Sequence, residues 1–134
     1  MLEIRGMRAV QMFALFLAPL ILPNAASAHH SFAMFDATRQ VTVEGVVKNF
    51  AWSNPHVWLD VVAVNDKGES QVWGLESLAV GLLYRDGWTA DTLKPGDKVT
   101  VQLHPMRDGT VGGQLMKVTL PDGRVLNSGA GGRN

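Results

Sequence analysis

The chain has 134 residues, with 12 basic and 12 acidic side chains and no cysteine. This length favours a single domain. The absence of cysteine excludes a disulfide framework and a thiolate metal site. The balanced charge gives no electrostatic footprint for nucleic acid, so we expect no nucleic-acid partner.

The first 28 residues predict a secretory signal peptide. Arg5 and Arg8 precede an apolar run of 14 residues, 9–22, and residues 26–28 (Ala-Ser-Ala) form a small-residue cleavage site. The run is shorter than the roughly 20 residues that span a bilayer, which makes an uncleaved membrane anchor the weaker alternative. We therefore expect a periplasmic or secreted protein that is free of the membrane after cleavage.

Cleavage after residue 28 would leave 106 residues, beginning with His29. The loss of Arg5, Arg8 and Glu3 lowers the counts to 10 basic and 11 acidic side chains, a net charge of −1 with neutral histidines. A chain of that size can form one modest core. We expect a domain over 29–126 with an N-terminal arm at 29–39, followed by a disordered glycine-rich tail at 127–134.

The mature chain reads as short strands interrupted once by a helix. Alternating or β-branched apolar residues predict strands, and the helix is predicted by leucines of helical period. The expected strands are 40–47, 57–64, 69–75, 98–104, 114–120 and 124–126, and the expected helix is 77–85. Three strands, a helix and two further strands is the order of the five-stranded OB-fold barrel, a mostly β architecture. A small β-sandwich is the alternative.

Several residues carry specific structural expectations. Gly45 inside a strand pattern predicts a bulge or sharp bend, and Gly112-Gly113 before a strand predicts a barrel corner. Ser77 is the expected N-cap of the helix, and Gly87 is expected to end it.

Five motifs together resemble a family of small exported bacterial proteins that is catalogued only as a domain of unknown function. The motifs are His29-His30-Ser31-Phe32, Trp52-x-Asn54-Pro55-His56-x-Trp58, Gly87-Trp88, Leu93-Lys94-x-Gly96-Asp97 and Pro105-x-Arg107-Asp108-Gly109. The resemblance covers essentially the whole mature chain. It implies export and a small β domain, and it brings no established activity.

All four histidines lie in the mature part of the chain: His29, His30, His56 and His104. In an OB-fold, His56 would lie in the loop before the second strand and His104 at the end of the fourth. These loops border the usual binding region of the fold. Phe32 and Phe35 are expected to anchor the arm and to bring His29 and His30 to the same rim.

A histidine at the mature N-terminus can chelate a metal through its α-amine and its ring. A second imidazole would complete an all-nitrogen site of the kind that suits Cu(II), and Ni(II) or Zn(II) are the alternatives. This ligand logic resembles the histidine brace of copper oxygenases. Glu76 is a candidate for a carboxylate that contacts a ligand of such a site without binding the metal itself. Met34, Met106 and Met116 are candidate soft ligands for Cu(I). For each histidine taken alone, an ordinary structural role is the alternative.

A metal-free binding module is the second hypothesis. Trp52 and Trp58 flank the loop that contains His56, and with Asn54 and Arg107 they could bind a small ligand or a partner protein. Trp73 and Trp88 are expected to fill the core. Scattered carboxylates and the absence of a nucleophile, metalloprotease or phosphate-loop motif favour a protein that is not an enzyme.

Overall fold

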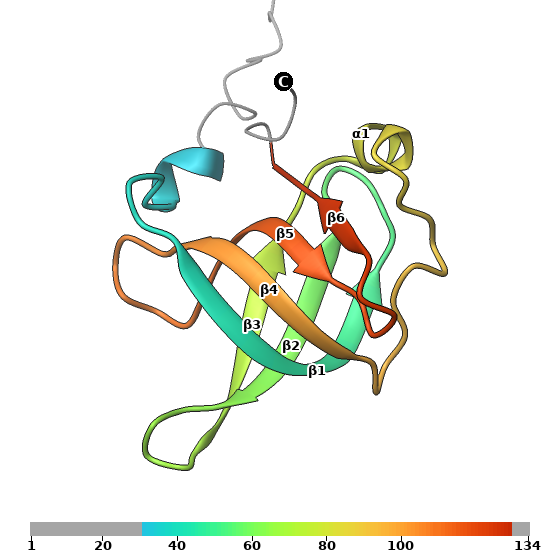
Figure 1. Ribbon diagram of the computed structural model, residues 1–134. Helices are drawn as coiled ribbons and strands as arrows, with labels where there is room; N and C mark the ends of the chain where they lie inside the picture. The colour runs from blue at the N-terminus through green and yellow to red at the C-terminus, as the bar shows by residue number, and fades with distance from the viewer. Residues whose placement is uncertain (1–30, 130–134) are drawn as a thin grey trace, which may run out of the picture.

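A computed structural model describes residues 31–129, which form a closed β-barrel with one short helix (Figure 1). The strands are β1 (Val41–Ala51), β2 (Trp58–Val64), β3 (Ser70–Glu76), β4 (Lys98–Pro105), β5 (Gly112–Thr119) and β6 (Val125–Asn127). The helices are the 3-10 turn η2 (Ser31–Met34) and α1 (Val80–Arg85). The predicted order of three strands, a helix and two strands with an added hairpin is confirmed.

The barrel closes through strand pairs that are distant in the sequence. The hydrogen-bonded order is β3-β2-β1-β4-β5-β6, and a parallel pairing of β3 with β5 joins the two sides. The remaining pairs are antiparallel. This closed five-stranded arrangement, with a helix between β3 and β4, is the OB-fold. The predicted fold class is correct, and β6 is the expected extra hairpin strand.

One continuous core fills the barrel. Its fully buried members come from every barrel strand, from the residue before β2, from α1 and from the segment after α1; they are Val47, Val57, Leu59, Val61, Leu75, Leu83, Trp88, Val101, Leu103, Leu115 and Val118. Period-two alternation explains the pattern, because β4 places Val99, Val101 and Leu103 inside and the residues between them outside. Trp88 is buried as expected. Trp73 is only partly buried and packs at the edge of the core.

Glycines stand where two strands approach too closely for a side chain. A Cβ at Gly113 would lie 2.3 Å from the carbonyl oxygen of His104, and one at Gly112 would lie 2.9 Å from that of Gly74. These two residues start β5 at its junction with β3, which is the predicted barrel corner. At Gly45 a Cβ would lie 2.4 Å from the carbonyl oxygen of Val62. The bulge itself falls three residues later, between Val47 and Asn49.

The predicted start of the helix differs from the structure. Helix α1 begins at Val80, and Ser77 is buried against Ser128 instead of capping it. The cap comes from another loop, because the Val80 N–H donates to Oδ1 of Asn54 at 3.0 Å. The helix does end before Gly87, whose φ of 88° suits glycine.

The packed domain extends past the predicted boundary at residue 126. The indole Nε1 of Trp88 donates to the carbonyl oxygen of Asn127 at 2.8 Å, and the Ser128 N–H donates to that of Met116 at 2.8 Å. Residues 127–129, the described part of the predicted tail, are therefore part of the domain. The predicted signal peptide and the rest of the tail lie outside the described residues.

Candidate functional site

The described residues of the N-terminal arm lie along the loop between β4 and β5. Phe35 is buried and forms an isolated bridge with Met106. The Asp36 N–H donates to the carbonyl oxygen of Pro105 at 2.8 Å, and the Arg107 N–H donates to that of Met34 at 2.9 Å. The arm is therefore attached to the barrel beside the end of β4, as the sequence predicted from Phe32 and Phe35.

Arg107 strengthens this attachment with its side chain. Its Nε donates to the carbonyl oxygen of Ala33 at 2.9 Å. Two further groups fix the turn that follows: the Thr38 hydroxyl and N–H donate to Oδ1 of Asp36 at 2.6 and 3.1 Å. These bonds from Thr38, helped by the charges of Arg107 and Arg39, lower the pKa of Asp36 from its ordinary value of 3.8. Arg107 was predicted as a ligand-binding residue, and its contacts here are with the arm.

The arm brings an aromatic ring against His56. The rings of Phe32 and His56 stack with centroids 5.9 Å apart and an interplanar angle of 23°. On its other side, Nδ1 of His56 contacts Oε1 of Glu76 at the end of β3. Both side chains are largely withdrawn from solvent, with exposed fractions of 29% for His56 and 13% for Glu76. Glu76 therefore contacts His56, and its role as the supporting carboxylate of a metal site stays a prediction.

His104 is held in a comparable way. Its Nδ1 lies 2.7 Å from the carbonyl oxygen of Arg39. A carbonyl oxygen only accepts, so the proton of a neutral ring lies on Nδ1 and the lone pair on Nε2. The carboxylate beside Nδ1 of His56 favours the same tautomer. Both histidines thus keep Nε2 as the nitrogen that can bind a ligand.

The strand register relates the two histidines. Glu76 of β3 is paired with Gln114 of β5, and Gln114 is paired with His104 of β4. His104 is therefore two strand spacings from Glu76, or about 10 Å between Cα atoms at the usual separation of strands. The two imidazoles lie at the same end of the barrel. Glu76 contacts His56, and the carbonyl oxygen of Arg39 contacts His104.

The predicted tryptophan pair is divided between two environments. Trp58 stands on the outside of β2, 39% exposed, with its ring beside Gly74 and its Nε1 donating to Oδ1 of Asp60 at 2.9 Å. Trp52 packs against the core, with its ring centroid 5.9 Å from that of Phe50. No ring contact joins Trp52 to Trp58 in the described part of the chain. Asn54 caps α1, as described above.

No group of three or more His, Cys, Asp or Glu side chains is arranged to hold a metal within residues 31–129. His29 and His30 lie outside that range, so the described residues include only two of the four predicted ligands. Within the same range no helix is long and apolar enough to cross a membrane.

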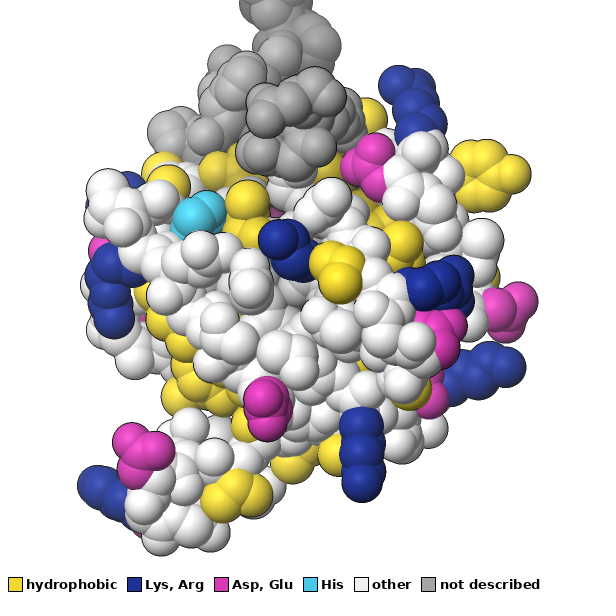
Figure 2. All heavy atoms as spheres, viewed as in Figure 1, with side chains coloured by type: hydrophobic (Ala, Val, Ile, Leu, Met, Phe, Trp, Pro, Cys, Tyr) yellow, Lys and Arg dark blue, Asp and Glu magenta, His cyan; other side chains and the backbone are white. Residues whose placement is uncertain are grey.

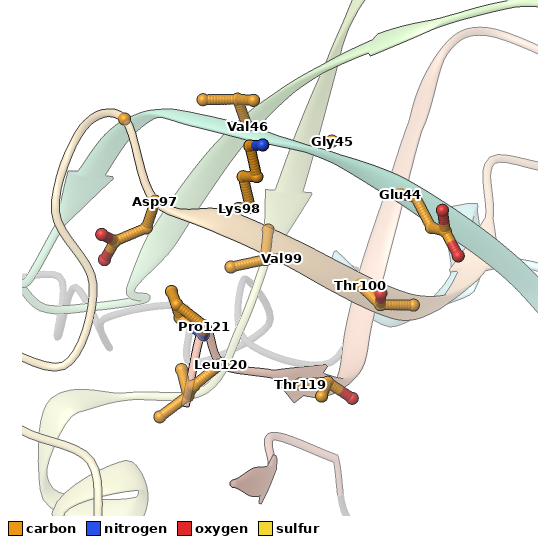
Figure 3. A pocket seen from close by; sticks show the side chains of 11 residues that line it. Glu44, Gly45, Val46, Asp97, Lys98, Val99, Thr100, Thr119, Leu120 and Pro121 are labelled. Carbon is orange, nitrogen blue, oxygen red and sulfur yellow. The ribbon is translucent and has the colours of Figure 1, made fainter. Parts of the chain in front are cut away.

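A hollow on the barrel surface lies away from these side chains. It has a volume of about 760 Å³ and is lined by the first residues of β4, the middle of β1 and the end of β5 (Figure 3). Its lining mixes charges, with Glu44, Asp97 and Lys98, and includes no histidine or tryptophan. None of the predicted site residues lines it.

Fold and site together define a small OB-fold barrel with an N-terminal arm docked beside a carboxylate-supported histidine. The chain belongs to a family of unknown function (DUF6152), whose model matches residues 19–116. This confirms the resemblance seen in the sequence.

Two further comparisons concern curated proteins and solved structures. No curated protein matches the chain. Among solved structures, the chain is similar to Rim1, a mitochondrial single-stranded DNA binding protein from S. cerevisiae, at 11% identity and a TM-score of 0.45. The match covers 68% of this chain and 97% of Rim1.

Proposed function

We propose that this protein is an exported, single-domain metal-binding protein, with copper as the favoured metal. The ligands in this proposal are the α-amine and imidazole of His29, created by cleavage after Ala28, together with Nε2 of His56. His30 and His104 are the further nitrogen ligands in this proposal. The proposed location is the periplasm or the exterior of the cell.

The observation that carries the proposal is the stacking of Phe32 on His56. His29 precedes Phe32 by three positions, and three residues span at most about 11 Å. A terminal amine at residue 29 is therefore within reach of the imidazole of His56.

The surroundings of His56 and His104 support the same proposal. Metal-ligating histidines usually direct their second ring nitrogen to a carboxylate or a backbone carbonyl, which fixes the ring and raises its basicity. His56 has Glu76 in that role and His104 has the carbonyl of Arg39. Nitrogen ligands without thiolate favour Cu(II), with Ni(II) and Zn(II) as competitors.

Charge supports the expectation that nucleic acid is not the ligand. Basic and acidic side chains are interspersed over the visible face of the domain, and neither sign forms a continuous patch there (Figure 2). A backbone-binding surface would need a basic stripe.

The experiment compares Cu(II) affinities of secreted protein that begins at His29. One variant has an alanine inserted before His29, and the others are His56→Ala and His104→Ala. We expect the insertion and His56→Ala each to lower the affinity at least tenfold. Equal affinity in the inserted variant would contradict the role of the terminal amine. Equal affinity in all three variants would contradict the site and favour a metal-free module that binds through Trp58.

A further inference from the structure

Two buried serines join the end of β3 to the end of β6, beside the contact between His56 and Glu76. Ser77 follows Glu76 directly, Ser128 follows β6, and both side chains are withdrawn from solvent. Their hydroxyl groups are hydrogen-bonded to each other. Serine is mostly an exposed residue, and a buried hydroxyl without a partner costs about 1–3 kcal/mol. The pair is therefore a specific link between residues 51 positions apart in the sequence.

This link continues a short junction between two barrel strands. The parallel ladder of β3 and β5 consists of three residue pairs, and the pair of Glu76 with Gln114 is its last. Ser128 lies beside β5 just beyond that pair, because its N–H donates to the carbonyl oxygen of Met116 at 2.8 Å. The hydroxyl pair therefore extends the closure of the barrel one residue past Glu76.

On its other side, Ser77 is bonded to the residue that follows His56. The Ser77 N–H donates to the carbonyl oxygen of Val57 at 2.9 Å, and the Val57 N–H donates to that of Leu78 at 2.9 Å. Ser77 is thus held between β2 through its backbone and Ser128 through its side chain. Because Glu76 precedes Ser77 directly, this double attachment also sets the direction of the Glu76 carboxylate toward His56.

The position of this carboxylate decides which ring nitrogen of His56 can bind a ligand. Nδ1 of His56 is shielded from solvent and contacts Oε1 of Glu76. A proton on a buried Nδ1 needs an acceptor beside it, and the carboxylate supplies one. If the carboxylate moves away, the neutral ring is more stable with its proton on Nε2. A nitrogen that carries a proton cannot bind a metal.

We propose that Ser128 is a positioning residue for His56, which acts through Ser77 and Glu76 to keep the imidazole proton on Nδ1 and Nε2 free for a metal. The inference rests on the proposed function, because it gives Ser128 a part in metal binding without contact with the metal. It has one consequence that precedes metal binding, the tautomer of His56. It has a second consequence for the affinity of the loaded site.

The first measurement is the nitrogen NMR spectrum of the His56 ring in metal-free protein that begins at His29, at alkaline pH where imidazole is neutral. We expect the wild type to be protonated on Nδ1. Ser128→Ala and Ser77→Ala break the same contact, so each should move the proton toward Nε2, and the double variant should move it no further. Val101→Ala is the control for lost stability, because Val101 is fully buried in β4 outside this chain of contacts. Circular dichroism verifies that each variant is folded.

The second measurement is the affinity of the same proteins for Cu(II). Ser128→Ala should lower it about fivefold, which is less than the loss expected for the supporting carboxylate itself. In protein that already carries Glu76→Gln, Ser128→Ala should have no further effect on the affinity. Unchanged nitrogen shifts in Ser128→Ala, an equal change in Val101→Ala, or a full loss of affinity in the Glu76→Gln background would overturn the proposal. Failure of the proposed function is distinguishable, because His56 would then bind no Cu(II) in any protein while its tautomer still responded to Ser128→Ala.

Discussion

The contact between His56 and Glu76 determines what the imidazole of His56 can do. The carboxylate holds Nδ1, the ring of Phe32 covers one face, and Nε2 is left for a ligand. A histidine fixed in this way loses little rotational freedom when it binds a metal. The contribution of Glu76 to the metal affinity of the proposed site can therefore be measured separately.

We predict that Glu76→Gln lowers the affinity for Cu(II) by about 10-fold to 100-fold, the usual effect of removing a supporting carboxylate. The glutamine keeps the size of the side chain, so the fold should be retained, as circular dichroism can verify. Asp60→Asn is the control, because Asp60 bonds Trp58 and Asn49 on the same sheet without touching His56. Equal affinities for wild type and Glu76→Gln would contradict the supporting role.

A second prediction concerns the turn that holds the arm. The bonds from Thr38 lower the pKa of Asp36, so the ionised carboxylate is favoured in the folded state. Their stabilising contribution is present at pH values above 3.8 and is lost as the pH falls through the lowered pKa of the folded state. Thr38→Val should move this pKa back toward 3.8, as an NMR titration of the Asp36 carboxyl carbon would show. An unchanged titration curve in the variant would refute the assignment of the shift to the hydroxyl.

At the scale of elements, the junction of β3, β4 and β5 is the tightest point of the barrel. Gly113 is paired with Leu75 on one side and with Pro105 on the other. A methyl group there would meet the carbonyl oxygen of His104 at 2.3 Å and Cδ1 of Leu103 at 2.6 Å. A backbone carbonyl in a strand ladder cannot move aside without loss of hydrogen bonds.

We therefore expect Gly113→Ala to destabilise the domain by about 1–3 kcal/mol, the usual cost of overpacking. Gly81→Ala in α1 is the matched control, because no atom lies within 4 Å of its Cβ position. Alanine is the better helix former, so this variant should gain about 0.5–1 kcal/mol. Urea unfolding measures both changes. A neutral Gly113→Ala would show that the closure is looser than its geometry indicates.

The elements that could be predicted from sequence are those determined by local patterns. Strand β4 could be predicted from its own residues, because apolar Val99, Val101 and Leu103 alternate with polar residues. The turn at residues 94–97 marks where the strand begins. The start of α1 could not be read in this way. Ser77 has the chemistry of an N-cap, but its hydroxyl is bound to Ser128, 51 residues away, and the cap comes from Asn54.

The candidate site was predictable in part for the same reason. The loop position of His56 follows from the turn residues around it, and a carboxylate at Glu76 was a reasonable support. The contact of Phe32 with His56 depends on the docking of the arm along β4, a tertiary arrangement that no local pattern records. The roles of Asn54 and Arg107 as a helix cap and an arm clamp were missed because both partners are far away in the sequence.

At the scale of the whole molecule, both ends of the described chain are secured at the same end of the barrel. Phe32 contacts His56, which contacts Glu76, and the next residue, Ser77, contacts Ser128. Figure 1 shows the two ends of the coloured chain emerging together beside β6 and the blue 3-10 turn. Residues near both ends of the described chain therefore lie beside His56 and Glu76.

Truncation after Leu126 tests this closure. It removes the carbonyl oxygen that accepts from Trp88 and the hydroxyl that pairs with Ser77, so two buried groups lose their partners. We expect a loss of about 2–6 kcal/mol in the free energy of unfolding, at about 1–3 kcal/mol for each group. A chain that ends at Gly129 keeps both contacts and should match the wild type. Equal stability of the two truncated chains would show that these contacts contribute nothing.

The central claim is that the mature N-terminus and His56 bind one metal ion together. Electron paramagnetic resonance of the secreted protein with one equivalent of Cu(II) tests it most directly, because coupling to nitrogen nuclei counts the nitrogen ligands. We predict a spectrum with several equatorial nitrogens in the wild type. His56→Ala should lose the coupling of one imidazole nitrogen. The variant with an alanine inserted before His29 should also differ from the wild type, in a way that is distinct from His56→Ala. Identical spectra for the three proteins would contradict the account.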